Sequence, residues 1–148
     1  MGRVMPIMLD IQGVPRPQPR PRFVRGRVIS VADANARRWI ATVEAGAKAL
    51  VELRGKQSGP LAVAIGFRFP TRDKARHGKP HTFRPDVDNL AKLILDCLMR
   101  AGLIDDDACV SSLAVQKTWD ETGRAVVWIE EDSRKDEQPT PPPRWLSN

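Results

Sequence analysis

The chain has 148 residues, and its 24 lysines and arginines outnumber 18 acidic residues, giving a net charge of +6. This length suits one domain with a hydrophobic core, and the basic balance favours a polyanionic partner such as nucleic acid. No apolar run approaches the roughly 20 residues of a membrane span, and the two cysteines lack metal-ligand spacing. We therefore expect a cytoplasmic protein with buried thiols, and the composition argues against a disulfide-rich secreted scaffold.

The N-terminal region is predicted to hold one strand and one basic loop. Apolar residues alternate over residues 7–12 and stop at Gly13, which indicates a first strand. Residues 14–22 contain four prolines, which exclude a helix or an inner strand and predict an extended loop. The arginines of this loop, among them Arg20 and Arg22, suit either an arm that contacts phosphates or a solvated linker.

A long helix and a buried strand are expected next. Ser30 or Asp33 can cap a helix that ends near Leu53, and the apolar residues of this helix share one face that should pack in the core. After a break rich in glycine and proline, residues 61–69 form a second predicted strand. Gly66 within this strand marks either a bulge or close packing.

The polar loop over residues 70–84 concentrates basic side chains just before a pair of acids. A basic loop beside carboxylates suits phosphodiester chemistry, because the DNA backbone must be drawn to a site that would otherwise repel it. The same sequence also suits a mobile solvated loop. His77 and His81 lie in this loop, and both hydrogen-bonding roles and metal or acid–base roles stay open for them.

The acids that follow this loop begin the most informative stretch of the chain. If the backbone is extended at Asp86 and Asp88, both carboxylates leave from the same side and can share one cation. Asp88 or Asn89 is predicted to cap the next helix, whose apolar residues repeat at helical spacing. Asp88, Lys92 and Asp96 form a charged stripe, which is either functional or a surface network worth about 0.3–0.5 kcal/mol per pair.

An acidic turn at residues 105–107 follows the end of this helix near Ala101. The helix is roughly 18 Å long, and the segment from residue 101 to residue 107 reaches at most about 20 Å when extended. The turn can therefore approach the first acids, with little slack, if an extended segment returns alongside the helix and enters the next strand directly. Three crowded carboxylates repel one another and raise some of their pKa values unless a divalent cation joins them. Carboxylates without cysteine favour Mg²⁺ or Mn²⁺ over zinc.

The C-terminal part is predicted to contain two strands and a tail. Alternating residues over 110–119 and 125–129 predict a hairpin with a short loop. The charged and then proline-rich end is predicted to be flexible, with Trp145 either a docking anchor or incidental. The order strand, helix, strand, helix, strand, strand predicts an α+β domain with two helices on a small mixed four-stranded sheet.

The run RPDVDNLAKLILDCLMRAGLIDDDACV, residues 84–110, resembles the signature of the RusA family of Holliday junction resolvases. The shared pattern is a basic residue, then P-D-x-D-N-L-x-K, a later aspartate, an A-G turn and acids just before the next strand. The resemblance covers about residues 60–130 well and the N-terminal third weakly. It implies a RusA-like endonuclease domain at residues 1–132, followed by the flexible tail at residues 133–148.

The resemblance also assigns roles to individual residues. It implies that Asp86, Asp88 and Asp107 are catalytic carboxylates that bind Mg²⁺, with Mn²⁺ as a substitute, and that Lys92 is the essential basic residue beside them. Because the turn is a triple acid, Asp106 stays open as an alternative or supporting ligand. The expected DNA contacts come from basic side chains of the two loops, namely Arg20, Arg22, Lys74, Arg76, Lys79 and Arg84.

The implied activity is a metal-dependent endodeoxyribonuclease that resolves four-way DNA junctions by paired symmetric nicks in recombination and repair. Such a junction has two-fold symmetry, so one site in each chain implies a homodimer. Two alternatives stay open. One is a non-catalytic module that binds branched DNA, and the other is a nuclease for different branched DNA, because nothing in these residues encodes junction shape.

Overall fold

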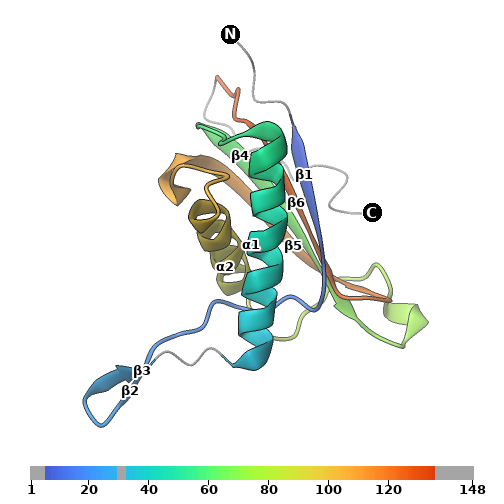
Figure 1. Ribbon diagram of the computed structural model, residues 1–148. Coiled ribbons are helices and arrows are strands. Elements are labelled where there is room, and N and C mark those ends of the chain that lie inside the picture. Colours follow the sequence, from blue (N-terminus) through green and yellow to red (C-terminus); the bar gives the residue numbers. More distant parts are fainter. Residues whose placement is uncertain (1–5, 30–32, 136–148) are drawn as a thin grey trace.

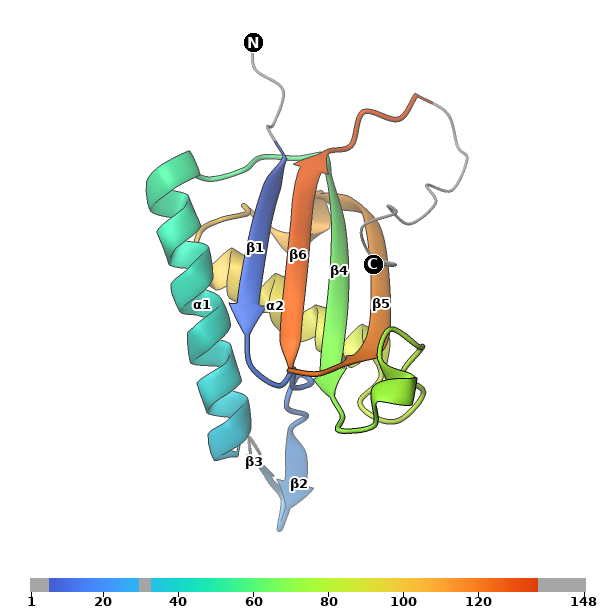
Figure 2. The same cartoon turned by 90° about the vertical axis from the view of Figure 1, so that its right-hand side faces the viewer.

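The computed structural model describes residues 6–29 and 33–135, and the body of this part is a four-stranded sheet with two helices on one face (Figures 1 and 2). The strand order across the sheet is β1-β6-β4-β5. This arrangement confirms the predicted α+β class with a mixed sheet. The strands are β1 (Ile7–Gln12), β4 (Leu61–Pro70), β5 (Val110–Asp120) and β6 (Arg124–Glu131).

Strand β4 lies at the centre of the pairing, because it runs parallel to β5 and antiparallel to β6. The predicted hairpin of the last two strands is therefore wrong, since β4 separates them. The connection between β5 and β6 is three residues long. Such a connection can close a hairpin, but it can also cross the roughly 10 Å over one intervening strand, so its length does not distinguish these two arrangements. The buried residues Val63, Ile65, Phe67 and Phe69 all belong to β4, as their alternation predicted.

Helix α1 (Ala34–Arg54) and helix α2 (Val87–Arg100) form the second layer. The Asp33 side chain caps α1 by accepting a hydrogen bond of 2.8 Å from the Ala36 amide, which confirms one of the two predicted caps. The other candidate, Ser30, lies outside the described residues. Helix α1 contacts β1 and α2, while α2 contacts β5, so the core fills the space between the helices and one face of the sheet.

A small second sheet was not predicted from the proline-rich segment. Strands β2 (Arg22–Val24) and β3 (Arg27–Ile29) pair as an antiparallel hairpin that projects away from the main body (Figure 1). Its turn places Arg25 at φ 52° and Gly26 at φ 75°. Glycine adopts such a conformation without steric cost, and two consecutive positive φ values suit a tight hairpin turn. The segment before Arg22 remains without strand or helix, as expected.

Several smaller expectations are settled by the same structure. The bulge considered at Gly66 is absent, because Gly66 pairs in regular register with both neighbouring strands. The register shift in the pairing of β4 with β5 lies between Leu61 and Ala62. Cys97 is buried and Cys109 is half-buried, and both are free thiols. Neither α1 nor α2 has the length and apolar character that a membrane crossing requires. The proposed tail lies largely outside the described residues, which end at residue 135.

Candidate active site

The start of α2 places Asp86 and Asp88 in different backbone conformations, so the two carboxylates do not form the extended pair that was predicted. Asp86 occupies the N-cap position with extended backbone angles, whereas Asp88 already lies in the first helical turn. The expectation of a fully extended pair capped by Asp88 or Asn89 is therefore wrong. The Asp86 carboxylate makes no capping hydrogen bond. The cap instead uses the Asp86 carbonyl, which accepts from the Leu90 amide at 3.1 Å, so the carboxylate is not committed to the helix.

A hollow of about 420 Å³ between α2 and β5 gathers most of the predicted catalytic residues. The charged stripe of α2 lines it with Asp88, Lys92 and Asp96, and Asp107 joins from the short 3₁₀ helix η2 (Asp107–Cys109). Its walls are completed by apolar side chains, among them Leu113 of β5. The chain thus doubles back as required, although η2 intervenes before β5 where a direct extended entry was expected.

Asp86 lies on a neighbouring hollow rather than on this one. That second hollow is lined by Arg20, Arg84, Asp86 and Asn89, together with the loop residues between them. Within residues 6–29 and 33–135, no three His, Cys, Asp or Glu side chains are grouped closely enough to hold one metal ion. The joint metal site of Asp86, Asp88 and Asp107 therefore stays a prediction.

The three acids of the turn have different partners. Asp105 pairs with the Lys56 ammonium at 3.2 Å and accepts a hydrogen bond from the Ser58 hydroxyl at 3.3 Å. The Asp106 carboxylate caps η2 by accepting from the Ala108 amide at 2.9 Å. Asp107 alone of the three lines the hollow between α2 and β5. This division of roles favours Asp107 over Asp106 as the acid that faces a ligand.

The pKa values of the neighbouring carboxylates Asp106 and Asp107 in the turn shift in opposite directions. The pKa of Asp107 is raised, first by its hydrogen bond with Asp106, then by desolvation and by the nearby charges of Asp106 and Asp96. The positive charge of Lys92 acts in the opposite direction on the same pKa. The pKa of Asp106 is lowered, mainly by the Ala108 amide. A cation placed in the hollow would relieve the repulsion on Asp107.

The loop that leads into α2 is attached to β5 by hydrogen bonds. The Gly78 amide donates to the Trp119 carbonyl at 2.8 Å, and the His81 amide donates to the Lys117 carbonyl at 3.1 Å. The Lys117 ammonium then donates to the carbonyls of Phe83 at 2.6 Å and Pro85 at 2.8 Å, directly before Asp86. No role was predicted for Lys117. Its sequence signal is a single charge that alternates with the apolar residues Leu113, Val115 and Trp119 along the strand.

The two histidines of this loop are occupied by structural contacts. The His77 ring contacts the Thr71 carbonyl at 2.9 Å. His81 is 6% exposed; its ring stacks on Phe69 with centroids 4.2 Å apart and packs at a tilt against Trp119 at 4.3 Å. Burial and, secondarily, the charge of Lys117 lower the pKa of His81, which favours the neutral form of the ring. Of the two open interpretations, the structure favours loop-stabilising histidines.

The basic residues assigned to DNA fall into two groups. Arg20 and Arg84 border the Asp86 hollow, and the arm that carries Arg20 is held there by a 3.0 Å hydrogen bond from the Gln18 amide to the Asn89 carbonyl. Arg76 instead lies over the Trp119 ring, 5.6 Å from its centroid. Lys74 and Lys79 are exposed in the same loop as Arg76, and the side chain of Arg22 lies outside what the structure describes.

A sheet covered on one face by two helices, with an acidic hollow beside a basic arm, defines a small α+β protein whose carboxylates suit a hard cation. The family model for endodeoxyribonuclease RusA matches residues 12–130. The chain therefore belongs to the RusA endodeoxyribonuclease family, as the motif at residues 84–110 had indicated.

One curated relative is a protein of Lactococcus phage r1t named crossover junction endodeoxyribonuclease rusA. It is 32% identical to this chain over 72 residues, which is 49% of this chain and 55% of the relative. The chain thus matches about half the length of that protein.

Proposed function

We propose that this protein is a Mg²⁺-dependent endodeoxyribonuclease that resolves four-way DNA junctions by paired symmetric nicks. The observation that carries the proposal is the hollow between α2 and β5, where Asp88, Lys92 and Asp107 meet from segments far apart in the sequence. Family membership and the name of the phage relative support the same activity. The cellular setting that we propose is DNA recombination and repair in the cytoplasm.

The donor set around the hollow fits magnesium. All the candidate ligands are carboxylate oxygens, which hard divalent cations prefer. The pKa of Asp107 is raised first by its hydrogen bond with Asp106 and also by nearby acidic charges, whose repulsion a cation would relieve. Asp88 and Asp107 would hold the ion, with Asp86 contributing from the adjacent hollow. When bound, Mg²⁺ would supply the Lewis acidity that activates a water and stabilises the leaving oxygen.

The remaining side chains suit the handling of a phosphodiester. Lys92 lies one helical turn beyond Asp88 and can offset negative charge that develops on the reacting phosphate. Arg20 and Arg84, beside Asp86, can hold the neighbouring phosphate with their guanidinium groups. Lys117 fixes the two carbonyls that precede Asp86 and thereby orients the first acid.

The symmetry of the substrate extends the proposal to a homodimer. A four-way junction needs two matched nicks, and one carboxylate site in each chain supplies one of them. Sedimentation of the protein with and without junction DNA tests this point, and a monomer in a one-to-one complex with cleaved junction would contradict it.

Cleavage of a labelled mobile four-way junction, with Mg²⁺ or with a chelator, tests the activity. We expect symmetric nicks only with the metal. Asp88→Asn and Asp107→Asn should each abolish nicking while junction binding persists, because the amide removes a metal ligand without removing a DNA contact. Asp105→Asn is the matched control, since Asp105 pairs with Lys56 and Ser58 and should leave the nicking rate unchanged.

Two outcomes would point to the alternatives. Tight junction binding without nicking under any divalent ion would replace the enzyme with a non-catalytic binding module. Nicking of flaps or forks at rates equal to or above those of four-way junctions would retain the nuclease and discard junction resolution.

A further inference from the structure

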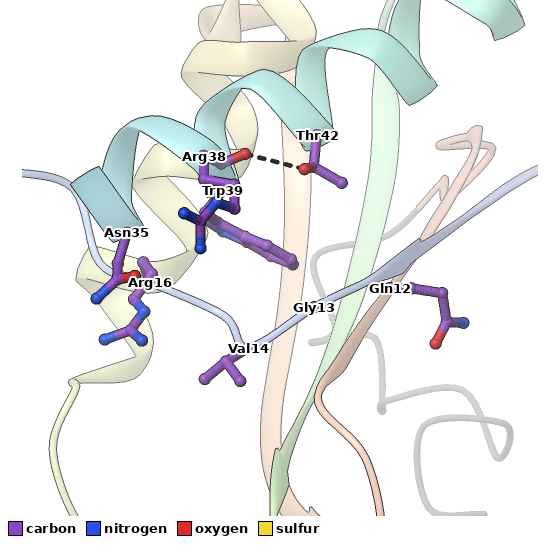
Figure 3. A pocket seen from close by; sticks show the side chains of 8 residues that line it. All are labelled: Gln12, Gly13, Val14, Arg16, Asn35, Arg38, Trp39 and Thr42. Carbon is purple, nitrogen blue, oxygen red and sulfur yellow. Dashed lines mark hydrogen bonds between the residues drawn. The ribbon is translucent and has the colours of Figure 1, made fainter.

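A separate hollow of about 240 Å³ lies where the end of β1, the proline-rich arm and the first turns of α1 meet (Figure 3). Trp39 of α1 lines it and is itself 3% exposed. Gly13 keeps the chain close to this ring, because a Cβ at that position would stand 3.3 Å from the Trp39 ring. The hollow is outside the acidic site described above.

The charge of this hollow is entirely positive. Arg16 from the arm and Arg38 from α1 line it together with the Asn35 amide, and no carboxylate is among the lining residues. In Figure 3, Arg16 and Asn35 lie beside the first turn of α1, and Arg38 extends from the following turn. The nearby carboxylate of Asp33 is used to cap α1 and does not line the hollow.

Arg16 and Arg38 have no acidic partner within the described ranges, so their charges are available to a ligand. Arg100 pairs with Glu44 at 2.8 Å, whereas neither Arg16 nor Arg38 forms an ion pair there. Two guanidinium groups that line one hollow repel each other, and an anion between them would offset that repulsion. Their forked donors match the oxygens of a phosphate group.

The arm links this hollow to the active-site region. Arg16 lines the first hollow, and residues 17–20 line the hollow that contains Asp86. The arm is fixed between them by the hydrogen bond from the Gln18 amide to α2. Four extended residues span at most about 13 Å, which is about four nucleotides at the 3.4 Å rise of a duplex strand.

We propose that Arg16, Arg38 and Asn35 form a binding site for one backbone phosphate of the DNA substrate, within about four nucleotides of the phosphate held beside Asp86. The inference rests on the proposed function for its choice of DNA. The site holds the strand and takes no part in bond cleavage. A phosphate contact remote from the reacting atoms positions the strand without reading its sequence.

The salt dependence of DNA affinity tests the site. Loss of one phosphate contact lowers the slope of log K against log salt by about 0.9, which corresponds to about tenfold weaker binding at 0.1 M salt. We expect this change for Arg16→Gln and for Arg38→Gln, on junction and linear duplex alike. Because both side chains bind the same phosphate, the double variant should lose no more slope than either single variant.

Lys48→Gln is the matched control. Lys48 is an exposed cation on the same helix and lies outside the hollow, so its loss changes the net charge without removing the contact. It should leave the slope unchanged. Circular dichroism melting of each variant excludes unfolding as the cause of weaker binding.

The outcomes separate this inference from the proposed activity. A wild-type slope for Arg38→Gln overturns it, and so does a double variant that loses two contacts. A melting-temperature increase with inorganic phosphate at fixed ionic strength, lost in Arg38→Gln without any change in DNA slope, would mark a site for free anions and also overturns it. If the unaltered protein binds DNA without nicking and the slopes change as expected, the phosphate site stands while the nuclease proposal falls.

Discussion

The three consecutive aspartates at residues 105–107 show how a short acidic run divides its roles. Asp105 is neutralised by Lys56, and Asp106 satisfies a backbone amide of η2. Asp107 instead shares a hydrogen bond with Asp106 and lines the hollow, and its pKa is raised. A carboxylate held in this way is unfavourable for the empty protein and favourable for one that binds a cation.

Asp107→Asn should raise the melting temperature at neutral pH. The hydrogen bond with Asp106, desolvation and the nearby acidic charges raise the pKa of Asp107, so its ionised form is disfavoured in the folded protein. A raised carboxyl pKa makes stability fall as pH rises through the interval above the ordinary value of about 4. The advantage of the asparagine variant should therefore disappear below about pH 4, where the carboxyl is protonated in both states.

Thermal melting from acid to neutral pH measures this effect, and Asp105→Asn provides the comparison. That variant loses the ion pair with Lys56 and should gain no stability at any pH. Added Mg²⁺ should stabilise the unaltered protein more than Asp107→Asn. A gain for Asp107→Asn that is equally large in acid and at neutral pH would disprove the electrostatic explanation.

At the scale of elements, the connection between β4 and α2 is held in place by β5. Backbone hydrogen bonds at Gly78 and His81 extend the edge of the sheet, and the Lys117 side chain completes the attachment just before Asp86. The start of α2 is therefore located by a strand that follows it in the sequence. The position of the first acid depends on this tertiary contact as well as on the helix itself.

Lys117→Met should destabilise the protein by about 2 kcal/mol, because two carbonyls lose a charged donor. It should also slow nicking, since Asp86 loses its fixed position. Urea unfolding measures the first effect, and single-turnover cleavage measures the second. Lys117→Arg should retain most of both properties. Lys48→Met removes an equal charge from α1, and a cost as large as that of Lys117→Met would refute the anchoring role.

At the scale of the whole molecule, three segments converge at Gly123. This residue lies in the connection between β5 and β6, and its carbonyl accepts a hydrogen bond of 3.1 Å from the Gly13 amide at the end of β1. A Cβ at position 123 would stand 2.7 Å from the Gly13 carbonyl oxygen and 2.8 Å from the Val14 Cα. The contact joins the C-terminal strands to the first residues of the basic arm.

Gly123→Ala should cost about 1–3 kcal/mol, because the added methyl group meets backbone atoms that cannot move independently. It should also weaken DNA binding, since Val14 begins the arm. Chemical unfolding and DNA titration measure the two effects. Thr122→Ala changes the exposed neighbouring position and should alter neither. If Gly123→Ala is as stable as the unaltered protein, the close contact between the turn and the start of the arm does not contribute to stability, and the prediction is wrong.

Local patterns predicted most elements closely. The period of apolar residues placed α1 and α2, the Asp33 cap marked the start of α1, and alternation located β1 and β4. These features depend on neighbours within a few residues. The small sheet β2–β3 was not predicted, because the four prolines before it indicate an extended loop. The Arg25-Gly26 pair that follows is nevertheless compatible with a hairpin turn.

The sequence by itself determined the class of fold, the spacing of the acids and the family to which the chain belongs, because each depends on residue type and local order. Only the tertiary structure decided that β4 separates β5 from β6, that Asp107 faces the hollow, and that Asp86 borders a different one. Strand pairing and the meeting of distant side chains are set by packing of the whole core. No short window of sequence contains the partners on which that packing depends.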